Sequence, residues 1–432
     1  MAELGGLGVT YRPKLLFICH ILPYPPDEGA KIRSYNILRQ LARAFDITAL
    51  CFYRIKSGVT VAQVPERVAL LREFADLTAF PIPQEHNRPR FVWDHLRSST
   101  SHRVYTDYVF ASRQFRSHLT EVLRSESFDL AHVTNVLSSY LPLLRRIPVA
   151  LSHDNFEPGL LCRRAEAERA PYRRAYVAYQ ARLTENMLRH WCDEVAVNVV
   201  VSEKDRADLQ RLAPRARFAI APNGVDIERF SPLPSANRGI VFVGGTNWSP
   251  NYEALTHFCE NILPLIQRSG TPVPVRWVGH ASVKLQRACR QRYGVDLTGY
   301  VDDIRPYVRD AACYVVPLRV GGGSRLKILD AWAMGKAVVS TSIGCEGLSA
   351  VDGENILIRD TPEEFAAAVR SVLRDEDLRC RLGEHGRETV VQYYSWDIVG
   401  SKLVNEYLEL IDRSRKHAEL SAARHAQRGG DS

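Results

Sequence analysis

The sequence predicts an α/β fold of two domains, each built on a parallel β-sheet. The 432-residue chain is longer than a single hydrophobic core usually organises. Short apolar runs alternate with amphipathic segments of helical period along most of the chain, which is typical of β-α-β units. A polar stretch with two prolines at 231–238 interrupts this alternation, which then restarts. These observations predict two domains joined by a linker.

In the first half of the chain, the apolar runs Lys14–Cys19 and Ile47–Phe52 predict strands that are buried on both faces. Apolar residues between them recur at helical spacing and predict a helix (Ile37, Leu38, Leu41 and Phe45). Further strands are predicted at Phe128–Val133, Val149–His153 and Val195–Val201. One long helix is predicted over about 160–190, and a shorter one at Pro65–Phe74.

In the second half, four more apolar runs predict strands separated by helices: Ile240–Val243, Val273–Val278, Cys313–Val316 and Ala337–Ser340. The last residues are polar and rich in Ala and Arg, which is typical of a disordered end. The predicted organisation is a first domain over 1–230, a linker at 231–238, a second domain over 239–395, a helix at 396–412 and a disordered tail at 413–432.

The net charge of +8 favours anionic partners such as nucleotide phosphates or lipid head groups. No basic and aromatic nucleic-acid-binding module is recognisable, so nucleic acid is not expected as a partner. The nine cysteines include no C-x-x-C pair, which predicts reduced thiols rather than disulfides or a zinc site. No signal-peptide pattern opens the chain and its apolar runs are strand-sized. We therefore expect a cytoplasmic protein, at most peripheral on the inner face of the cytoplasmic membrane.

The densest candidate site is Val320–Gly335, which follows a predicted strand and begins a helix. Three consecutive glycines in it would let backbone N–H groups approach an anion. Ser324 is a candidate N-cap, and Arg325 and Lys327 would fall in the first helical turn. Cations at that position oppose the helix dipole, which indicates a bound anion. Two solvated cations beside a glycine-rich turn are the alternative.

Asp330 would lie further along the same helix, among apolar residues. A carboxylate at that depth caps no helix end. It could accept hydrogen bonds from the two hydroxyls of a ribose. A structural aspartate whose carboxylate is satisfied inside the protein is the alternative.

A second candidate loop follows the strand predicted at Ile240–Val243. Gly244 and Gly245 end the strand, and Thr246 and Asn247 lead into the next helix. This strand-to-helix turn has the form of a phosphate-binding loop. Glycines are also common in such turns for packing, so the motif alone is weakly specific.

Two more candidates follow predicted strands of the first domain. Gly29 precedes a helix that carries two cations in its first residues and could present an anion-binding N-terminus. His153 ends its strand beside a polar loop and could handle a proton or orient a substrate. The Gly29 loop is neither G-x-G-x-x-G nor G-x-x-x-x-G-K-[ST], which disfavours a dinucleotide-binding enzyme and a P-loop NTPase.

Taken together, five segments resemble family 4 of the retaining glycosyltransferases, in the order in which that family has them. They are PNGVDIERF (222–230), VFVGGTNWSPN (241–251), GGGSRLKILDAWAMGKAVVSTSIGCEGL (321–348), DGENILI (352–358) and YYSWD (393–397). The resemblance covers about residues 12–412. It implies the GT-B fold, in which two Rossmann-like domains with parallel sheets face a central donor cleft.

The resemblance also implies roles for single residues. Asp330 falls on the second Glu of the family's E-x7-E motif, which binds the donor ribose, whereas the first Glu falls on Gly322 and is absent. The family's Arg and Lys after the first strand of the C-terminal domain are also absent, so Arg325 and Lys327 would replace that diphosphate clamp. Glu346 resembles an acidic position of the family, and His153 matches the His that orients the donor sugar.

The predicted site therefore has three catalytic residues and a larger donor-binding set. The catalytic residues are His153, Arg325 and Lys327. The donor-binding residues are Gly29, Gly244, Gly245, Thr246, Asn247, Gly322, Gly323, Ser324, Leu326, Asp330 and Glu346. No metal site and no cofactor are expected, because the donor is a co-substrate and no metal-binding D-x-D accompanies the motifs.

The implied activity is transfer of a sugar from a nucleoside-diphosphate-sugar to a saccharide or lipid-linked hydroxyl acceptor, with retention of anomeric configuration. The GGGSRLK variant is similar to sugar transferases of bacterial exopolysaccharide systems, including some linked to exosortases. Three rival functions remain. A scaffold that binds sugar nucleotides without catalysis would explain Gly322, and an epimerase of the same fold or an NAD-dependent dehydrogenase is less well supported.

Arg88–Arg116 combines arginines with six aromatic residues: Phe91, Trp93, Tyr105, Tyr108, Phe110 and Phe115. Basic and aromatic side chains together suit a membrane surface, and family members often meet membrane-borne acceptors with this part of the N-terminal domain. The equally supported alternative is a helical subdomain whose aromatic residues form a core.

Overall fold

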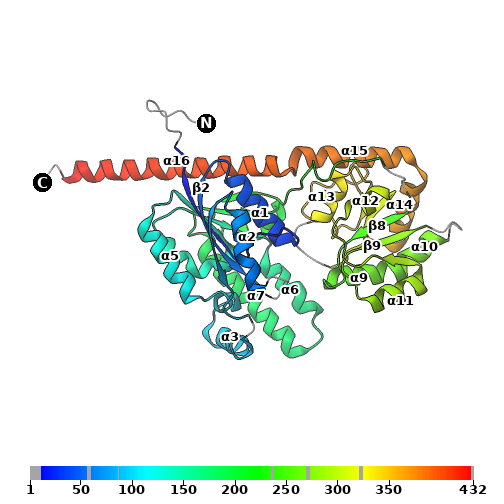
Figure 1. The fold of residues 1–432 in the computed structure, drawn as a ribbon, viewed down its shortest axis with the longest axis horizontal. Coiled ribbons are helices and arrows are strands. Elements are labelled where there is room, and N and C mark those ends of the chain that lie inside the picture. Colours follow the sequence, from blue (N-terminus) through cyan, green and yellow to red (C-terminus); the bar gives the residue numbers. More distant parts are fainter. Residues whose placement is uncertain are drawn as a thin grey trace. The chain divides into compact units, whose positions relative to one another are not determined.

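The computed structural model describes residues 11–55, 60–85, 87–234, 238–268, 273–320 and 325–429. They form two compact units, each a parallel sheet flanked by helices (Figure 1). Unit 1 comprises Met1–Ala221 and Gly400–Ser432, and unit 2 comprises Pro222–Val399. The α/β fold predicted from the alternation of apolar runs and amphipathic segments is confirmed.

Unit 1 contains a seven-stranded parallel sheet of order β3-β2-β1-β4-β5-β6-β7. Its strands are β1 (Lys14–Cys19), β2 (Asp46–Tyr53), β3 (Asp76–Pro81), β4 (Leu130–Thr134), β5 (Val149–Ser152), β6 (Val197–Val200) and β7 (Phe218–Ile220). Its α-helices are α1 (Gly29–Leu41), α2 (Val64–Leu71), α3 (Arg88–Ser101), α4 (Tyr105–Val109), α5 (Arg113–Ser125), α6 (Glu157–Ala167), α7 (Pro171–Cys192) and α8 (Glu203–Leu212). Two 3-10 segments complete it, η2 (Val61–Gln63) and η3 (Asn135–Leu144).

The helix predicted over 160–190 is wrong in one respect, since the chain forms α6 and α7 there. Ala170 between them is extended, with φ −81° and ψ 119°. It precedes Pro171, and a residue before proline is pushed out of helical conformation by the proline ring. The break therefore follows from a local rule that amphipathic spacing alone does not reveal.

Unit 2 contains a six-stranded parallel sheet of order β10-β9-β8-β11-β12-β13. Its strands are β8 (Ile240–Val243), β9 (Val275–Val278), β10 (Val295–Leu297), β11 (Cys313–Val316), β12 (Val338–Ser340) and β13 (Leu357–Ile358). Its helices are α9 (Ser249–His257), η4 (Phe258–Ile262), α10 (Leu263–Gln267), α11 (Val283–Tyr293), α12 (Arg305–Asp310), α13 (Leu326–Ala333), α14 (Pro362–Arg374) and α15 (Glu376–Tyr393). The four predicted strands are present, and β10 and β13 are too short to give a sequence pattern.

Unit 2 begins at Pro222, before the predicted linker, because Val225 is tied to the end of the unit. The backbone N–H of Val225 donates to the Tyr394 carbonyl at 2.8 Å, and Val225 forms an isolated bridge with Ser395. A Cβ on Gly224 would lie 2.7 Å from the Trp396 ring, so only glycine permits this close approach. The segment PNGVD therefore packs within unit 2.

Helix α16 (Trp396–Gly429) continues through residues that the sequence predicts as a disordered tail. From Gly400 onward it belongs to unit 1. The Tyr407 hydroxyl lies 2.7 Å from Nδ1 of His132 on β4, and Arg415 pairs with Asp129 at 2.7 Å. Among the described residues, no helix combines the length and the apolarity needed to cross a membrane.

In both sheets the chain order reverses at one point, between β1 and β4 in unit 1 and between β8 and β11 in unit 2. Loops leave neighbouring strands in opposite directions at such a switch point, which opens a crevice at the carboxyl ends of the strands. Open α/β sheets bind ligands there. The two switch points are therefore where the predicted site residues have to be examined.

We expect Gly383→Ala to destabilise unit 2 by about 1–3 kcal/mol. A Cβ on Gly383 in α15 would overlap the carbonyl oxygen of Gly335, which follows α13. Alanine normally improves a helix by about 0.5–1 kcal/mol over glycine, but a backbone clash outweighs that gain. Urea unfolding measures the change, with Glu384→Ala at the exposed neighbouring position as control. Equal stability of both variants would contradict the prediction.

Candidate functional site

The switch point of unit 2 brings together the loop after β8 and the start of α13 (Figure 1). Arg325 occupies the N-cap position of α13, and Lys327 is the second residue of the helix. The predicted donor residues Gly322, Gly323 and Ser324 lie outside the described residues, so their roles stay predictions. The N-cap assignment to Ser324 moves to Arg325, because α13 begins at Leu326.

Lys327 connects the two segments of this switch point. Its Nζ donates to Oδ1 of Asn251 at 2.8 Å and lies 4.4 Å from the centre of the Phe242 ring. Asn251 in turn donates through Nδ2 to the Gly245 carbonyl at 2.9 Å. Burial, together with the nearby charge of Arg325, lowers the pKa of Lys327 to about 7. No carboxylate within the described parts of the chain pairs with this ammonium.

The loop after β8 is packed tightly against the next strand end. The backbone N–H of Thr246 donates to the His280 carbonyl at 2.7 Å, and its hydroxyl donates to the same oxygen at 2.9 Å. A Cβ on Gly245 would lie 2.5 Å from Oδ1 of Asn247, and one on Gly244 would lie 2.6 Å from the Asn251 amide. A side chain at Gly244 would therefore displace the Phe242 ring and the Asn251 amide, whereas one at Gly245 would first meet the flexible end of the Asn247 side chain.

Arg325 is 4% exposed, and its guanidinium lies 3.6 Å from a carboxylate oxygen of Glu346. The sequence assigns both residues to the donor site without relating them to each other. Because a buried cation needs a partner, Glu346 accounts for part of the charge of Arg325. The structure therefore gives Arg325 a carboxylate partner that Lys327 lacks.

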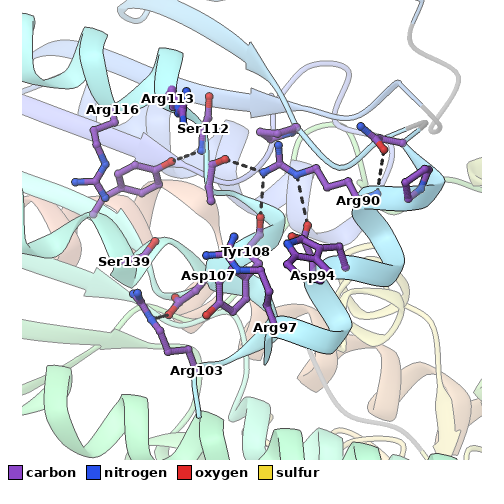
Figure 2. A pocket seen from close by; sticks show the side chains of 16 residues that line it. Arg90, Asp94, Arg97, Arg103, Asp107, Tyr108, Ser112, Arg113, Arg116 and Ser139 are labelled. Atoms are coloured by element: carbon purple, nitrogen blue, oxygen red, sulfur yellow. Dashed lines mark hydrogen bonds and ion pairs between the residues drawn. The ribbon is translucent and has the colours of Figure 1, made fainter. Parts of the chain in front are cut away.

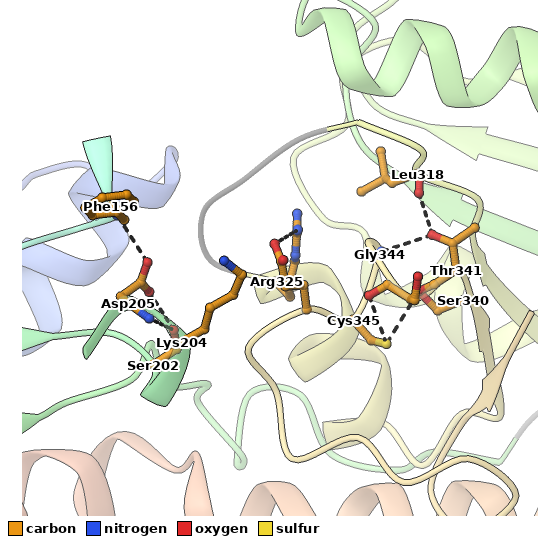
Figure 3. A network of polar contacts seen from close by, with 12 residues as sticks. Phe156, Ser202, Lys204, Asp205, Leu318, Arg325, Ser340, Thr341, Gly344 and Cys345 are labelled. Carbon is orange, nitrogen blue, oxygen red and sulfur yellow. Dashed lines mark hydrogen bonds and ion pairs between the residues drawn. The ribbon is translucent and has the colours of Figure 1, made fainter. Parts of the chain in front are cut away.

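A network of hydrogen bonds fixes the turn that carries Glu346 (Figure 3). The Thr341 hydroxyl donates to the Leu318 carbonyl and accepts from the Gly344 N–H at 3.0 Å. The Cys345 thiol donates to the Thr341 carbonyl at 3.4 Å. This turn follows β12 and is hydrogen-bonded to Leu318, just after β11. Contacts at the carboxyl ends of both strands therefore position the turn that carries Glu346.

Asp330 is part-buried on α13, and its carboxylate makes no hydrogen bond or ion pair with any other described residue. Burial raises the pKa of its carboxyl group to about 7, against a smaller opposite effect of Arg229. Leu326, on the same helix, packs partly buried against the apolar core of unit 2. An unsatisfied carboxylate at a switch point is an available acceptor for hydroxyl groups.

At the edge of unit 1, His153 follows β5 and is 1% exposed. Its Nε2 lies 3.0 Å from Oδ1 of Asn198, whose Nδ2 donates to the Cys192 carbonyl at 2.8 Å. Asn198 therefore presents its oxygen to the ring, which places the imidazole proton on Nε2. Burial lowers the pKa of His153 to about 4, so the ring is neutral and its Nδ1 is an acceptor with no hydrogen-bond partner among the described residues.

Charged groups surround His153 within unit 1. Arg33, on α1, lies 3.3 Å from Asp154 and donates to the Ala221 carbonyl at 2.8 Å. Burial raises the pKa of Glu157, and Asp154 adds to this effect. Burial opposes the charged form of His20, but Cys19, Asp154 and Glu157 together raise its pKa. This edge combines a neutral histidine with a paired arginine and two carboxylates.

The residues around Gly29 give little support to its predicted role in anion binding. Gly29 is the exposed first residue of α1, after Glu28 at the N-cap. The next cation, Lys31, is buried and already pairs with Asp27 at 2.8 Å. The loop between His153 and α6 is fixed instead by Asp205, which accepts from the Phe156 N–H at 3.1 Å (Figure 3).

Sequence reasoning missed Asn251, Asn198 and Asp154 as members of these two edges. Asn251 and Asn198 act through other residues at long sequence separation, which no local spacing reveals. Asp154 stands next to His153 in the polar loop after β5. The position of that loop at a strand end was the available signal, because charged residues there gather at the ligand-binding edge.

Two family models match the chain, and together they cover most of it. The model described as Glycosyltransferase Family 4 matches residues 28–229, and that described as Glycosyl transferases group 1 matches residues 237–375. Both models describe glycosyltransferases, and the chain has the GT-B fold. The second matched region contains the switch point of unit 2 with Lys327 and Asp330, and the first begins after β1 and contains β4 and His153.

Curated relatives of this GT-B chain are glycosyltransferases matched over part of their length. The lipopolysaccharide core biosynthesis glycosyltransferase LpsE of Rhizobium meliloti is 34% identical over 27% of this chain and 34% of its own length. A GDP-mannose-dependent α-(1-6)-phosphatidylinositol monomannoside mannosyltransferase of Mycobacterium tuberculosis is 25% identical over 52% of this chain and 64% of its own. The chain thus spans between about a third and two thirds of these relatives.

Solved structures of the same fold match nearly the whole GT-B chain. The sucrose-phosphate synthase of Thermosynechococcus elongatus has a TM-score of 0.64 and 15% identity, covering 93% of this chain and 100% of its own. Anabaena HepE in complex with UDP and glucose has a TM-score of 0.60 and 14% identity, covering 92% and 100%. At these identities the likeness establishes the fold.

Proposed function

We propose that the protein is a retaining glycosyltransferase whose nucleoside-diphosphate-sugar donor binds at the switch point of unit 2. One observation carries this proposal. Lys327 and Asp330 are both part-buried on α13, at the ligand-binding edge of the sheet. Within the described part of the chain, the Lys327 ammonium has no carboxylate partner and the Asp330 carboxylate accepts no hydrogen bond. Groups left in this state cost folding free energy unless a ligand satisfies them.

The two groups match the two polar parts of a nucleoside diphosphate. Lys327 supplies a cation to the diphosphate, and the Asp330 carboxylate accepts hydrogen bonds from the ribose hydroxyls. Arg325 adds positive charge from the N-cap position, with Glu346 fixing its orientation. HepE, which shares the fold, is described in complex with UDP and with UDP-glucose, and this supports a nucleotide-sugar donor for the present protein.

In the proposed reaction the bond between the sugar and the diphosphate breaks, and the acceptor hydroxyl attacks from the face that the diphosphate leaves. Lys327 and Arg325 stabilise the charge that develops on the leaving diphosphate. The acceptor proton passes to a leaving phosphate oxygen, because no side chain of the described residues is assigned as a general base. His153 of unit 1 is neutral, and its Nδ1, which has no hydrogen-bond partner among the described residues, is an available acceptor for a sugar hydroxyl.

The place of this reaction is proposed to be polysaccharide or glycolipid biosynthesis, including exopolysaccharide assembly. The names of LpsE and of the phosphatidylinositol monomannoside mannosyltransferase support that assignment. Neither a metal ion nor another cofactor is part of the proposed site. The second candidate, a scaffold that binds sugar nucleotides without transfer, is motivated by Gly322, where the family has a carboxylate.

Thermal unfolding with UDP, GDP, ADP and NAD tests the donor site. A ligand that binds only the folded state raises the unfolding temperature by mass action. At a ligand concentration of a hundred times Kd, the free energy of unfolding rises by about 2.7 kcal/mol. We expect one nucleoside diphosphate to stabilise the protein and NAD to leave it unchanged. Stabilisation by NAD alone would contradict the proposal.

Donor turnover separates the enzyme from the scaffold. UDP-glucose, which HepE is described as binding, and GDP-mannose, on which the mannosyltransferase is described as dependent, are incubated with the protein and a mixture of candidate acceptors, and nucleoside-diphosphate release is measured. We expect release from one donor, with the product anomer retained as read by NMR. Binding without release under every condition favours the scaffold.

A further inference from the structure

A cavity of about 300 Å³ lies at the amino ends of β8 and β9, at the edge of the unit 2 sheet opposite its switch point. The start of β8, the strand β9 and the end of α12 line it. Small-molecule pockets have volumes of about 300–1,000 Å³, so this cavity suits a small ligand. Its polar lining residues are Arg238, Arg276, Tyr307 and Asp310.

The backbone of Arg238 is fixed beside this cavity. Its N–H donates to the Asp310 carbonyl at 2.8 Å. The next residue, Gly239, has φ +74°, and a Cβ on it would lie 2.3 Å from the Pro274 carbonyl oxygen, so this turn requires glycine. The Arg238 side chain is exposed and makes no hydrogen bond or ion pair with any described residue. A fixed backbone therefore carries a guanidinium group that is available to a ligand.

Arg276 reaches the same cavity from β9. Its neighbours in register are Val241 on β8 and Asp296 on β10. No ion pair joins Arg276 to Asp296, although the two residues are directly opposite each other. Within the described ranges, the Arg276 side chain also makes no hydrogen bond, and it lines the cavity instead. Two arginines without a paired carboxylate therefore line one small cavity.

Asp310 is the only carboxylate of the described lining, and it is already neutralised. Nε of Arg309 donates to it at 2.7 Å. Lys336, which is 7% exposed, donates to the carbonyls of Arg309 and Ala311 beside it. Hydrogen bonding to Arg309 lowers the pKa of Asp310, and the charges of Arg309, Arg276 and Lys336 lower it further. The cations around this carboxylate therefore outnumber it.

A larger cavity in unit 1, lined by α3, α4 and α5, has its own paired charges (Figure 2). There Arg90 lies 3.4 Å from Asp94, and Arg103 lies 3.2 Å from Asp107. That cavity belongs to segment 88–116, for which the family resemblance already predicts membrane contact. The cavity of unit 2 is different, because none of the five segments that resemble the family contains its two unpaired arginines.

The aromatic residues of 88–116 are divided by the structure. Phe110 and Phe115 are buried in the core of unit 1, whereas Phe91 and Trp93 are exposed on α3. The core alternative therefore holds for part of the segment, and membrane contact stays a prediction for the exposed part.

We propose that the cavity of unit 2 binds the phosphate group of a small soluble anion, either free phosphate or a phosphate monoester. Four cations surround one carboxylate there, which leaves three positive charges in excess: Arg238, Arg276, Arg309 and Lys336 against Asp310. Like charges held close together repel one another unless an anion binds between them. A phosphate group of a monoester carries a charge of about −1.5 to −2 and compensates most of this excess.

The shape and the donors of the cavity favour phosphate over other anions. The planar N–H forks of Arg238 and Arg276 suit the oxygens of a phosphate group. The Tyr307 hydroxyl, which has no hydrogen-bond partner in the described part of the chain, is a further donor. A single carboxylate would compensate less of the charge, and a long polyanion does not fit this volume. The site does not depend on the proposed donor chemistry.

Titration calorimetry on the full chain tests the cavity with inorganic phosphate and glucose 6-phosphate, at constant ionic strength. Malonate, a dicarboxylate, is the comparison. We expect malonate to bind about tenfold more weakly than the better phosphate, because its two charges lie on separate groups. Tighter binding of glucose 6-phosphate identifies a monoester as the ligand, and tighter binding of inorganic phosphate identifies the free ion. Equal binding of malonate, or no binding of either phosphate, would overturn the proposal.

Two variants of the lining are expected to change the phosphate affinity in opposite directions. Arg238→Gln/Arg276→Gln should bind about 100-fold more weakly, because each hydrogen bond to a charged group contributes a factor of about ten or more. Asp310→Asn should bind about three- to tenfold more tightly, because it removes the carboxylate of the lining and releases Arg309. Unchanged affinity in the double variant, or weaker binding by Asp310→Asn, would overturn the proposal.

A matched control removes two exposed arginines of α11 instead, in the variant Arg287→Gln/Arg290→Gln. Their side chains make no ion pair or hydrogen bond with described residues. This control has the same net charge as the double variant of the cavity and should bind phosphate as the wild type does. An equal loss in the control would reduce the effect to net charge and overturn the proposal. Urea unfolding of every variant distinguishes a loss of affinity from a loss of folding.

The proposed donor site also attracts phosphate, and Lys327→Met separates the two sites. This variant is expected to bind phosphate with the affinity of the wild type. The Arg238→Gln/Arg276→Gln variant is expected to bind nucleoside diphosphate as the wild type does. Loss of phosphate binding in Lys327→Met would place the phosphate at the donor site and overturn the assignment to the cavity.

Discussion

Asp330→Asn is expected to weaken nucleoside-diphosphate binding about 10- to 100-fold, because hydrogen bonds to a charged partner contribute about 1.5–3 kcal/mol. The carboxylate has no donor among the described residues and is proposed to accept from both ribose hydroxyls. An amide presents one acceptor atom, and its NH₂ group opposes the second hydroxyl. Isothermal titration with the nucleotide identified by thermal unfolding measures the loss. Unchanged affinity would remove Asp330 from the site.

The same substitution is expected to stabilise the ligand-free protein at neutral and alkaline pH. The folded-state pKa of Asp330 is raised to about 7 from 3.8, so stability relative to the unfolded chain is lost as pH rises through this range. Asparagine does not ionise, so the free energy of unfolding of the variant should rise relative to that of the wild type between pH 4 and 7. Above pH 7 the variant should remain the more stable protein. Asp296→Asn, on an exposed position of β10, is the matched control. If Asp330→Asn is more stable than the wild type but binds the nucleoside diphosphate more weakly, the Asp330 carboxylate serves ligand binding rather than stability.

Much of the fold could be predicted because buried parallel strands read as short apolar runs. Lys14–Cys19 and Ile240–Val243 were predicted with the bounds that the structure gives. Strand β3 (Asp76–Pro81) lay in a segment for which the sequence predicted no strand, and β13 has two residues. Such elements are held by neighbouring strands rather than by their own sequence, so local reasoning does not find them.

The candidate site was predicted in outline, since glycine-rich turns after strands are local features. Arg325 and Lys327 were expected to form one clamp, and the structure separates them. Arg325 pairs with Glu346, whereas Lys327 is held by Asn251 against the loop after β8. These pairings join residues far apart in the sequence, which spacing along the chain cannot reveal.

The burial of Asp94 and Ser98 on α3 shows a different limit. The sequence left open whether 88–116 faces a membrane or forms a helical subdomain with an aromatic core, and its spacing does not show which side of α3 is buried. Gln180 of α7 donates to Ser98 at 2.8 Å, and Gln84 donates to Asp94 at 3.0 Å. Polar partners from other elements therefore decide that the polar side faces inward. Only the tertiary structure contains that information.

Lys327→Met is expected to weaken nucleoside-diphosphate-sugar binding about 100-fold, because truncating one partner of a part-buried charge pair costs about 2–5 kcal/mol. Methionine has a similar length and keeps the packing on Phe242, so the change is mainly the loss of charge. Binding is measured by titration calorimetry, with urea unfolding as the control for stability. A variant that is stable and binds the donor normally would place the diphosphate elsewhere.

Alkaline pH is expected to reproduce the effect of Lys327→Met in the wild type. Burial lowers the pKa of Lys327 to about 7 from 10.5, so the free protein loses this charge as pH rises through 7. A bound diphosphate favours the ammonium, so binding takes up a proton, and affinity should fall up to about tenfold per pH unit above 7. Lys327→Arg keeps its charge, so its affinity should decline less with rising pH.

Burial also lowers the pKa of Lys336 to about 8, but Lys336 donates to the Ala311 carbonyl at 3.1 Å within the core. Its titration should change stability in both proteins alike, so a decline that persists in Lys327→Arg would assign the pH dependence to another group.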